Sequence, residues 1–400
     1  MLKVVSTQKA DEIIEEAFSS YSLDTEVVLL DSLTGRVLAE DVYSLEDVPS
    51  FDRSTVDGYA VIASDTFGSS ESMPCQSENI GEILMGQAAD REISSGKCMR
   101  ISTGGMLPKG ADSAVMVENT EELFDGMTLI YKSVSPGENV TKKGDDVKRG
   151  QLVIEKGTLL SSKHIGIISA LGITRPKCFR KLKVGIISSG DEVVPVNQNA
   201  EYGKVRDINS HMLGALFSEN GFDTELYGIV GDSYELLYEI TEKASRECDI
   251  ILLSGGSSAG ARDMTVKVIN DLGEVFVHGI AMKPGKPTII GRIGEKAVFG
   301  LPGHPAAAYF TAMRFALPLA KRISGCSKAS ETVRAVTSTN ISSNNGREEF
   351  IPVKLEDGTA YPIFRKSGVI SLLCEADGYI VIDRNKEGLK KDEEVEVVLF

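Results

Sequence analysis

Residues 249–272 read DIILLSGGSSAGARDMTVKVINDL, and this stretch decides the fold. The apolar run 249–253 predicts a strand, and the helical spacing of apolar residues from Met264 to Leu272 predicts a helix. Between them lies the glycine-rich turn 254–260, closed by Asp263. Glycines let the backbone approach a ligand, and a helix N-terminus offers unpaired N–H groups to an anion. The order predicts an oxyanion site; a plain capped turn is the alternative.

The residues on either side of this stretch alternate between strand-like and helix-like patterns. We expect strands at 184–188, 224–230, 274–278, 288–292 and 297–300, with helices at 208–219, 234–246 and 306–323. This alternation predicts a three-layer α/β body with a largely parallel sheet. Ligands of such sheets bind beyond the carboxyl ends of the strands. The loops 189–192, 207–209 and 254–260 should therefore share one edge.

The flanking regions predict further domains, so the fold class is α/β plus β and multidomain. Helical patterns at 7–20 and 159–171 enclose short β-like runs broken by glycine from about 62 to 140. Strands return from 330 onward, and we see no functional motif there. The predicted domains are a discontinuous helical linker domain (1–45 and 144–178), a β-rich insert (46–143), an α/β domain (179–326) and a C-terminal β domain (327–400).

The composition excludes several classes of function. The formal net charge is −15, so a nucleic-acid surface, which needs a basic field, is not expected. The six cysteines are scattered without a CxxC pair, which is typical of a reducing compartment. No apolar run reaches the roughly 18 residues that a membrane span needs. These features predict a cytoplasmic protein without nucleic-acid or membrane partners.

Charged side chains gather at the predicted sheet edge. Acidic residues occur at Asp191, Glu192, Asp207 and Asp263, and 278–287 (HGIAMKPGKP) adds Lys283 and Lys286. Lysines suit phosphate, while carboxylates beside phosphate are typical of Mg²⁺. The loop 300–305 (GLPGHP), with Pro302 and Gly303, precedes a helix. Taken singly, Asp207 fits a helix cap, Lys283 a surface charge and His304 a turn residue.

Eight motifs together resemble the molybdopterin molybdenumtransferases, the MoeA family, which is related to the E domain of gephyrin. The resemblance covers essentially the whole chain. The motifs are FDRSTVDGYA (51–60), STG (102–104), GDD (144–146), SSGDE (188–192), DIN (207–209), SGG (254–256) through Asp263, KPGKP (283–287) and LPGHP (301–305). The family often has Asn or Tyr at the position of His304.

The resemblance implies an elongated homodimer in which the α/β, molybdopterin-binding domain of one subunit faces the β insert of the other. It implies that adenylylated molybdopterin and molybdate become molybdenum cofactor and AMP, with Mg²⁺ as cofactor, and that the molybdopterin adenylyltransferase is a partner. The implied residues are catalytic Asp57, Glu192 and Asp263, with Glu192 and Asp263 on the metal. The implied ligand-binding residues are Thr103, Asp146 (or Asp145 beside it), Asp207, Asp232, Ser254, Gly255, Gly256, Lys283, Lys286, Pro302 and Gly303.

Two other functions fit parts of the chain. The molybdopterin adenylyltransferases share the α/β fold but are usually a lone α/β domain, which the flanking regions here argue against. A non-enzymatic scaffold, like the gephyrin E domain, would need an exposed apolar groove near the C-terminal domain, and the sequence shows none.

Overall fold

The computed structural model describes residues 4–255, 259–327, 330–343, 346–365 and 368–400. The described residues form two compact units. One comprises residues up to 39, 157–161 and 176–400, and the other comprises 40–156 and 162–175. The four predicted domain boundaries stay a prediction. Within the described ranges, no helix combines the length and the apolar character needed to cross a bilayer.

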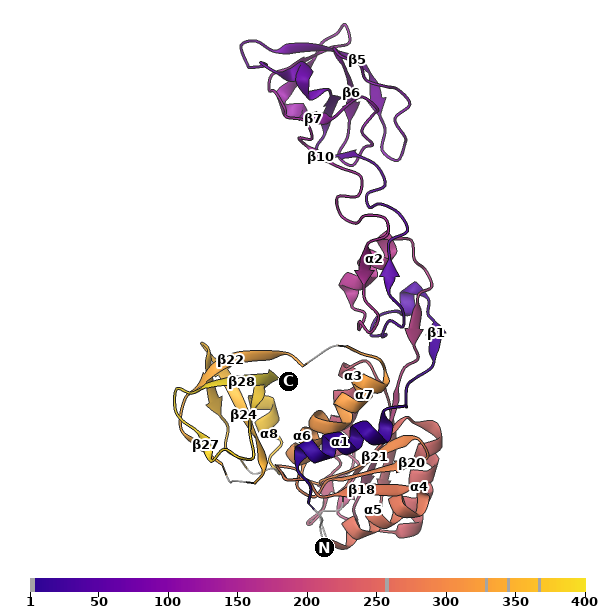
Figure 1. Ribbon diagram of the computed structural model, residues 1–400, viewed down its shortest axis with the longest axis vertical. Helices are drawn as coiled ribbons and strands as arrows, with labels where there is room; N and C mark the ends of the chain where they lie inside the picture. The colour runs from indigo at the N-terminus through magenta and orange to yellow at the C-terminus, as the bar shows by residue number, and fades with distance from the viewer. Residues whose placement is uncertain (1–3, 256–258, 328–329, 344–345, 366–367) are drawn as a thin grey trace. The chain divides into compact units, whose positions relative to one another are not determined.

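The larger unit is built on a six-stranded sheet with the order β16-β13-β17-β21-β20-β18 (Figure 1). Its first four strands are parallel, and β20 pairs in antiparallel fashion with both β21 and the edge strand β18. Their bounds are β13 Lys183–Ser189, β16 Asp223–Val230, β17 Ile250–Ser254, β18 Glu274–His278, β20 Ile289–Ile293 and β21 Lys296–Leu301. The largely parallel sheet predicted from the alternation is confirmed.

Helices cover both faces of this sheet. Along β17, Ile250 and Leu252 pack with α1, α3, α6 and α7, whereas Ile251 and Leu253 pack with α4 and α5. Successive strand residues point to opposite faces, so this buried strand is apolar throughout. The helices are α1 Thr7–Phe18, α3 Asn209–Glu219, α4 Tyr234–Glu247, α5 Ala259–Leu272, α6 Pro305–Thr311 and α7 Leu317–Ile323. The result is the expected three-layer α/β body.

The C-terminal part of this unit is a closed barrel. Strand β24 (Glu348–Glu356) pairs with both β25 and β26, and β25, β22, β28 and β26 complete the ring. The other bounds are β22 Thr332–Thr337, β25 Thr359–Pro362, β26 Gly378–Ile382 and β28 Glu394–Leu399, with α8 at Ser371–Glu375. Closure removes the open sheet edges of the barrel strands. The short strand β19 (Met282–Lys283) pairs in parallel with β24 and ties the barrel to the α/β body.

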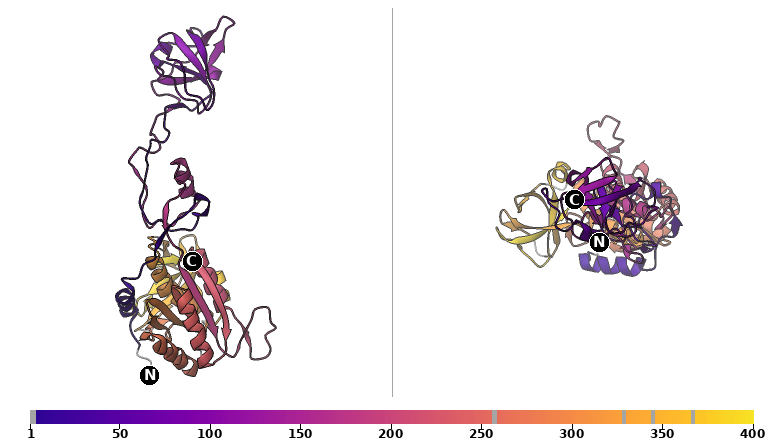
Figure 2. Two further views of the ribbon diagram at one scale, coloured as in Figure 1. Left: turned by 90° about the vertical axis from the view of Figure 1, so that its right-hand side faces the viewer. Right: turned by 90° about the horizontal axis from the view of Figure 1, so that it is seen from above.

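The smaller unit contains a second six-stranded sheet, ordered β7-β4-β6-β5-β9-β8 (Figure 2). Its strands are β4 Gly58–Val61, β5 Cys75–Ile83, β6 Lys97–Ile101, β7 Ser113–Met116, β8 Thr120–Glu122 and β9 Met127–Ile130. Two short pairs join it to the helix α2 (Ser162–Ala170), namely β3 (Arg53–Ser54) with β10 (Val140–Thr141) and β2 (Val42–Tyr43) with β11 (Leu152–Ile154). The β-rich character expected for this region is confirmed.

Two helices differ from the sequence prediction. The helix predicted from Met264 starts at Ala259, so Asp263 lies in its second turn rather than its first. The single closing helix predicted for 306–323 is divided by a π-helical turn at Ala312–Ala316. Arg314 in that turn donates to Asp11 at 2.9 and 2.6 Å and to Glu348 at 3.3 Å, so the irregular turn directs a half-buried arginine to α1 and to β24. The spacing of apolar residues, from which the helices were predicted, carries no information about these polar contacts.

Candidate active site

A cavity of about 240 Å³ lies beyond the carboxyl ends of β13 and β17. In the parallel register Ser188 lies opposite Ser254, and Ser254 lies opposite Leu301. The loops that follow these strands therefore leave the sheet from one row. The residues lining the cavity are Ser188, Ser189, Val193, Val205, Arg206, Asp207, Ile208, Asn209, Ser254, Gly255, Gly303, His304, Pro305 and Gly368. The structure thus brings together four of the predicted site residues, Asp207, Ser254, Gly255 and Gly303, and adds His304, which the sequence suggested as a turn residue.

Gly255 is the position where the glycine-rich turn requires glycine. Its φ is +150°, in the region that disfavours other residues. A Cβ there would lie 2.2 Å from Ser189 Oγ and 2.3 Å from its carbonyl oxygen. The first turn of the loop therefore packs directly on β13. Gly256 lies outside the described residues.

Asp207 is buried, and both of its carboxylate oxygens accept hydrogen bonds from the protein. One oxygen accepts from Ser188 Oγ at 2.8 Å and from the Ser210 N–H at 3.1 Å, and the other accepts from Ser210 Oγ. These bonds join β13 to the first turn of α3 and cap that helix. Asp207 therefore forms part of the cavity wall, and its side chain makes the contacts of a helix cap, the alternative that the sequence suggested.

Asn209 follows Asp207 at the start of α3. Its side-chain nitrogen donates to Ser254 Oγ at 2.8 Å and to the Gly303 carbonyl at 2.9 Å. One buried amide thus links the loops after β17 and β21. Asn209 belongs to the motif DIN (207–209) but is not among the residues predicted for the site. Its position two residues after Asp207, at a helix start, was the available signal.

Acidic side chains crowd the rim around the ends of β13 and β16. Asp191 accepts a hydrogen bond from the Asp232 N–H at 3.0 Å. Burial, together with the neighbouring charges of Asp191 and Glu192, raises the pKa of the Asp232 carboxyl. Glu192 and Asp263 are both exposed. Among the described residues, no three His, Cys, Asp or Glu side chains are grouped to hold a metal ion.

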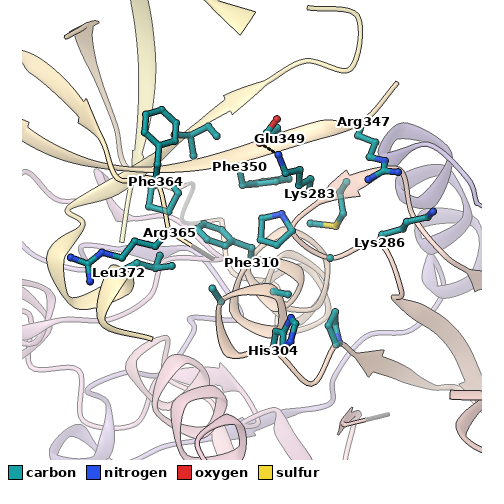
Figure 3. Close-up of a pocket in the computed structure, with 18 of the residues that line it drawn as sticks. Lys283, Lys286, His304, Phe310, Arg347, Glu349, Phe350, Phe364, Arg365 and Leu372 are labelled. Carbon is teal, nitrogen blue, oxygen red and sulfur yellow. Dashed lines mark hydrogen bonds and ion pairs between the residues drawn. The ribbon is translucent and has the colours of Figure 1, made fainter. Parts of the chain in front are cut away.

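A larger cavity of about 700 Å³ lies between the α/β body and the barrel (Figure 3). It shares His304 with the first cavity. The predicted Lys283, Lys286 and Pro302 line it, together with Arg347 and Arg365 from the barrel. Phe310 and Phe350 contribute an apolar part of the wall, as Figure 3 shows. This arrangement offers several cations around a partly apolar chamber, which suits an anionic ligand with a ring system.

The two predicted lysines differ in their surroundings. Lys283 Nζ lies 2.6 Å from Glu349 Oε1, and the other oxygen of this buried carboxylate accepts from Ser343 Oγ at 2.8 Å. Lys286 Nζ has no ion pair or hydrogen bond with any residue that the structure describes. Lys286 is therefore the more available cation. No functional motif was predicted among the strands from 330 onward, and the charged run Arg347–Glu349 ahead of buried Phe350 was the available signal.

The smaller unit holds the remaining predicted residues. Asp57 accepts hydrogen bonds from the Thr103 N–H at 2.7 Å and from Thr103 Oγ1 at 3.1 Å, and these bonds lower the pKa of its carboxyl. Asp145 accepts from the Lys142 N–H at 2.7 Å, which closes its own loop, and both Asp145 and Asp146 are exposed. Asp57 and Thr103 thus form a pair.

Comparison with known proteins places the chain in a family. Three family models match in order: "MoeA N-terminal region (domain I and II)" over 5–172, "Probable molybdopterin binding domain" over 185–322, and "MoeA C-terminal region (domain IV)" over 334–400. These matches show that the chain has the fold of the molybdopterin biosynthesis proteins. The chain is a member of the MoeA family.

Individual relatives agree with this assignment. A protein of Methanocaldococcus jannaschii named for molybdopterin biosynthesis is 37% identical over 98% of this chain and 97% of its own length. A molybdopterin molybdenumtransferase of Haemophilus influenzae is 30% identical over 95% of each chain. The crystal structure of a molybdopterin biosynthesis MoeA protein from Pyrococcus horikoshii has a TM-score of 0.84 at 41% identity, covering 99% of each chain.

Proposed function

We propose that the protein is a molybdopterin molybdenumtransferase, which inserts molybdate into adenylylated molybdopterin and releases AMP. The observation that carries this proposal is the pair of cavities that meet at His304. One is narrow and lined with hydroxyl, amide and glycine groups, and the other is wide and lined with cations. The proposed substrate has a ring system and phosphates, and it must receive molybdate, a separate oxyanion. Binding these groups together needs both kinds of surface.

Each residue would bind the part of the substrate that suits its chemistry. Lys286, Arg347 and Arg365 attract the phosphates and molybdate, because guanidinium and ammonium groups are suited to oxyanions. Lys283 also lines this cavity, but its ammonium charge is paired with the carboxylate of Glu349. Water attacks one phosphorus of the P–O–P bond that joins AMP to molybdopterin. The water oxygen stays on that phosphorus, the bond breaks, and AMP leaves. The two dithiolene thiols then bind molybdenum, and their two protons leave with one molybdate oxygen as water.

Mg²⁺ dependence is part of the proposal. Mg²⁺ commonly takes one or two carboxylates together with substrate phosphate oxygens and water. Glu192 and Asp263 are exposed carboxylates, and no three acidic, histidine or cysteine side chains among the described residues are arranged to hold a metal ion, which fits such a shared site rather than a protein cage. When bound, the ion would neutralise phosphate charge during cleavage.

A second copy of the chain would complete the site in a homodimer. Asp57 and Thr103 form an exposed hydrogen-bonded pair on the smaller unit, and Asp146 of the same unit is also exposed. We assign these residues to orient water or substrate held by the α/β body of the partner. Each active site would then draw on both subunits, and adenylylated molybdopterin would be received from the molybdopterin adenylyltransferase.

Turnover of adenylylated molybdopterin and molybdate, followed by AMP release, tests the activity. The Asp263→Asn variant should keep its melting temperature and bind substrate but lose AMP release, whereas Asp271→Asn, in the last turn of the same helix, should retain it. Chelation with EDTA should stop the wild type, and added Mg²⁺ should restore it. Transfer of AMP from ATP to molybdopterin would contradict the proposal and indicate an adenylyltransferase.

Subunit mixing tests the shared site. Asp57→Asn and Asp263→Asn proteins are each inactive in the proposal, but a mixed dimer contains one site with neither substitution. Random exchange should recover about a quarter of wild-type activity, because half of the dimers are mixed and each has one intact site of two. No recovery after verified exchange would contradict a site built from two copies.

A further inference from the structure

Glu349 is the one carboxylate among the described residues that line the 700 Å³ cavity. The other charged groups of the lining are the cations of Lys283, Lys286, Arg347 and Arg365. A carboxylate in this position opposes the binding of an anion, because like charges repel. Glu349 therefore acts against the cations that the cavity presents to a ligand.

The sheet and two neighbouring side chains fix the contacts of Glu349. Strands β19 and β24 pair in parallel, with Lys283 opposite Glu349. Lys283 Nζ donates to Glu349 Oε1 at 2.6 Å, and Ser343 Oγ donates to Oε2 at 2.8 Å. Figure 3 shows Lys283 and Glu349 side by side at the cavity wall. Each oxygen of the carboxylate thus has a partner within the protein.

The two members of this ion pair differ in exposure. The side chain of Glu349 is 9% exposed, whereas that of Lys283 is 50% exposed. An anion that drew Lys283 away would leave a buried carboxylate without its cation, which is costly. Lys283 is therefore held on Glu349, although its ammonium group has further N–H donors. Lys286 also lines the cavity, and no ion pair with a described residue restrains it.

We propose that Glu349 restrains Lys283 and thereby weakens the binding of oxyanions in the 700 Å³ cavity. The inference rests on the proposed function, in which this cavity holds molybdate and the substrate phosphates. Molybdate must give up its contacts with the cavity when it is transferred to the dithiolene, so tight binding before the transfer would raise the barrier. Glu349 is a positioning residue, which acts on the anion through Lys283.

Calorimetric titration with molybdate measures the effect of releasing Lys283. Glu349→Gln keeps the shape of the side chain and removes the charge that holds Lys283, so molybdate should bind about 3- to 30-fold more tightly. Glu356→Gln is the matched control. Glu356 lies on the same strand, pairs with Lys354 at 2.7 Å on the surface and is outside the cavity lining, so its substitution should leave the affinity unchanged.

A second substitution separates restraint of Lys283 from direct repulsion by Glu349. In a Lys283→Gln background no ammonium group is left to release, so Glu349→Gln should strengthen molybdate binding by at most about a third of the factor seen with Lys283 present. Direct repulsion alone would give the same factor in both backgrounds. That result, or no strengthening by a Glu349→Gln protein with a normal melting temperature, would overturn this inference alone.

Turnover gives a readout that a purely structural role would not change. Glu349→Gln should lower the KM for molybdate and also lower kcat for cofactor formation, because the anion is bound more tightly before its transfer. A lower KM with an unchanged or higher kcat would show that the restraint does not favour transfer, and would overturn the proposal.

A crystal structure of the wild type with molybdate tests the restraint without any substitution. Lys283 Nζ should stay bonded to Glu349 while molybdate contacts Lys286. A structure in which Lys283 has left Glu349 for molybdate would overturn this inference alone. Absence of molybdate from the cavity, together with no binding by calorimetry, would overturn the proposed function and this inference with it.

Discussion

Asp249, directly before β17, is a buried carboxylate on which donors from three chain segments converge. Arg180 donates to both oxygens at 2.8 and 2.6 Å, Tyr21 Oη at 2.7 Å, the Lys183 N–H at 2.9 Å and Lys296 Nζ at 3.3 Å. Burial by itself raises the pKa of this carboxyl, but the hydrogen bonds from Arg180, Lys183 and Tyr21 outweigh it and hold the pKa well below its usual range. These contacts anchor α1, β13 and β21 at the amino edge of the sheet.

The Asp249→Asn substitution keeps the shape and removes the charge. The new NH₂ group faces the N–H and O–H donors that bound the carboxylate, and Arg180 and Lys296 lose their counter-charge. Breaking a buried ion pair costs about 3–5 kcal/mol, but Arg180 is 36% exposed at its side chain, and solvent screens part of its loss. We therefore expect the free energy of unfolding to fall by about 2–4 kcal/mol.

Urea unfolding followed by circular dichroism measures this loss, since the chain contains no tryptophan. Asp223→Asn is the matched control, because Asp223 pairs with Lys181 at 3.2 Å on the exposed surface and should cost about 0–1 kcal/mol. The folded pKa of Asp249 is depressed, so its contribution is complete above the ordinary aspartate pKa of about 3.9 and decreases as the pH falls below it. A loss at pH 7 no larger than that of the control, or a difference from wild type that grows on acidification, would refute the reasoning.

Three further perturbations test the site and its supports. Gly255→Ala should lower stability by more than about 2 kcal/mol and abolish AMP binding, because its Cβ would meet Ser189 at 2.2 Å; a normal melting temperature would contradict the close approach. Lys283→Ala should cost roughly 1–3 kcal/mol by leaving buried Glu349 without its cation, whereas Lys286→Ala should leave stability unchanged and weaken molybdate binding measured by calorimetry; the reverse pattern would refute the assignment. Arg314→Met should lower the melting temperature, corresponding to about 1–3 kcal/mol, because Glu348 loses a partner, while Arg334→Met, at an exposed pair, should not.

The sequence by itself determined the α/β body. The apolar strands and the spacing of the helices are local or periodic features, and the structure reproduces them. The convergence of the loops after β13 and β17 at one sheet edge also follows from a general rule, since parallel strands end on the same side.

Tertiary structure decided what each charged or polar group has available for a ligand. Asp207 and Lys283 fit ligand chemistry by residue type, yet Ser188 and Ser210 occupy the first and Glu349 pairs with the second. The side-chain nitrogen of Asn209 is held by Ser254 at the end of β17 and by Gly303 in the loop after β21. A polar group acts on a ligand only with the hydrogen-bonding capacity that the protein leaves over, and the partners that consume this capacity come from distant segments, which no spacing rule along one chain reveals.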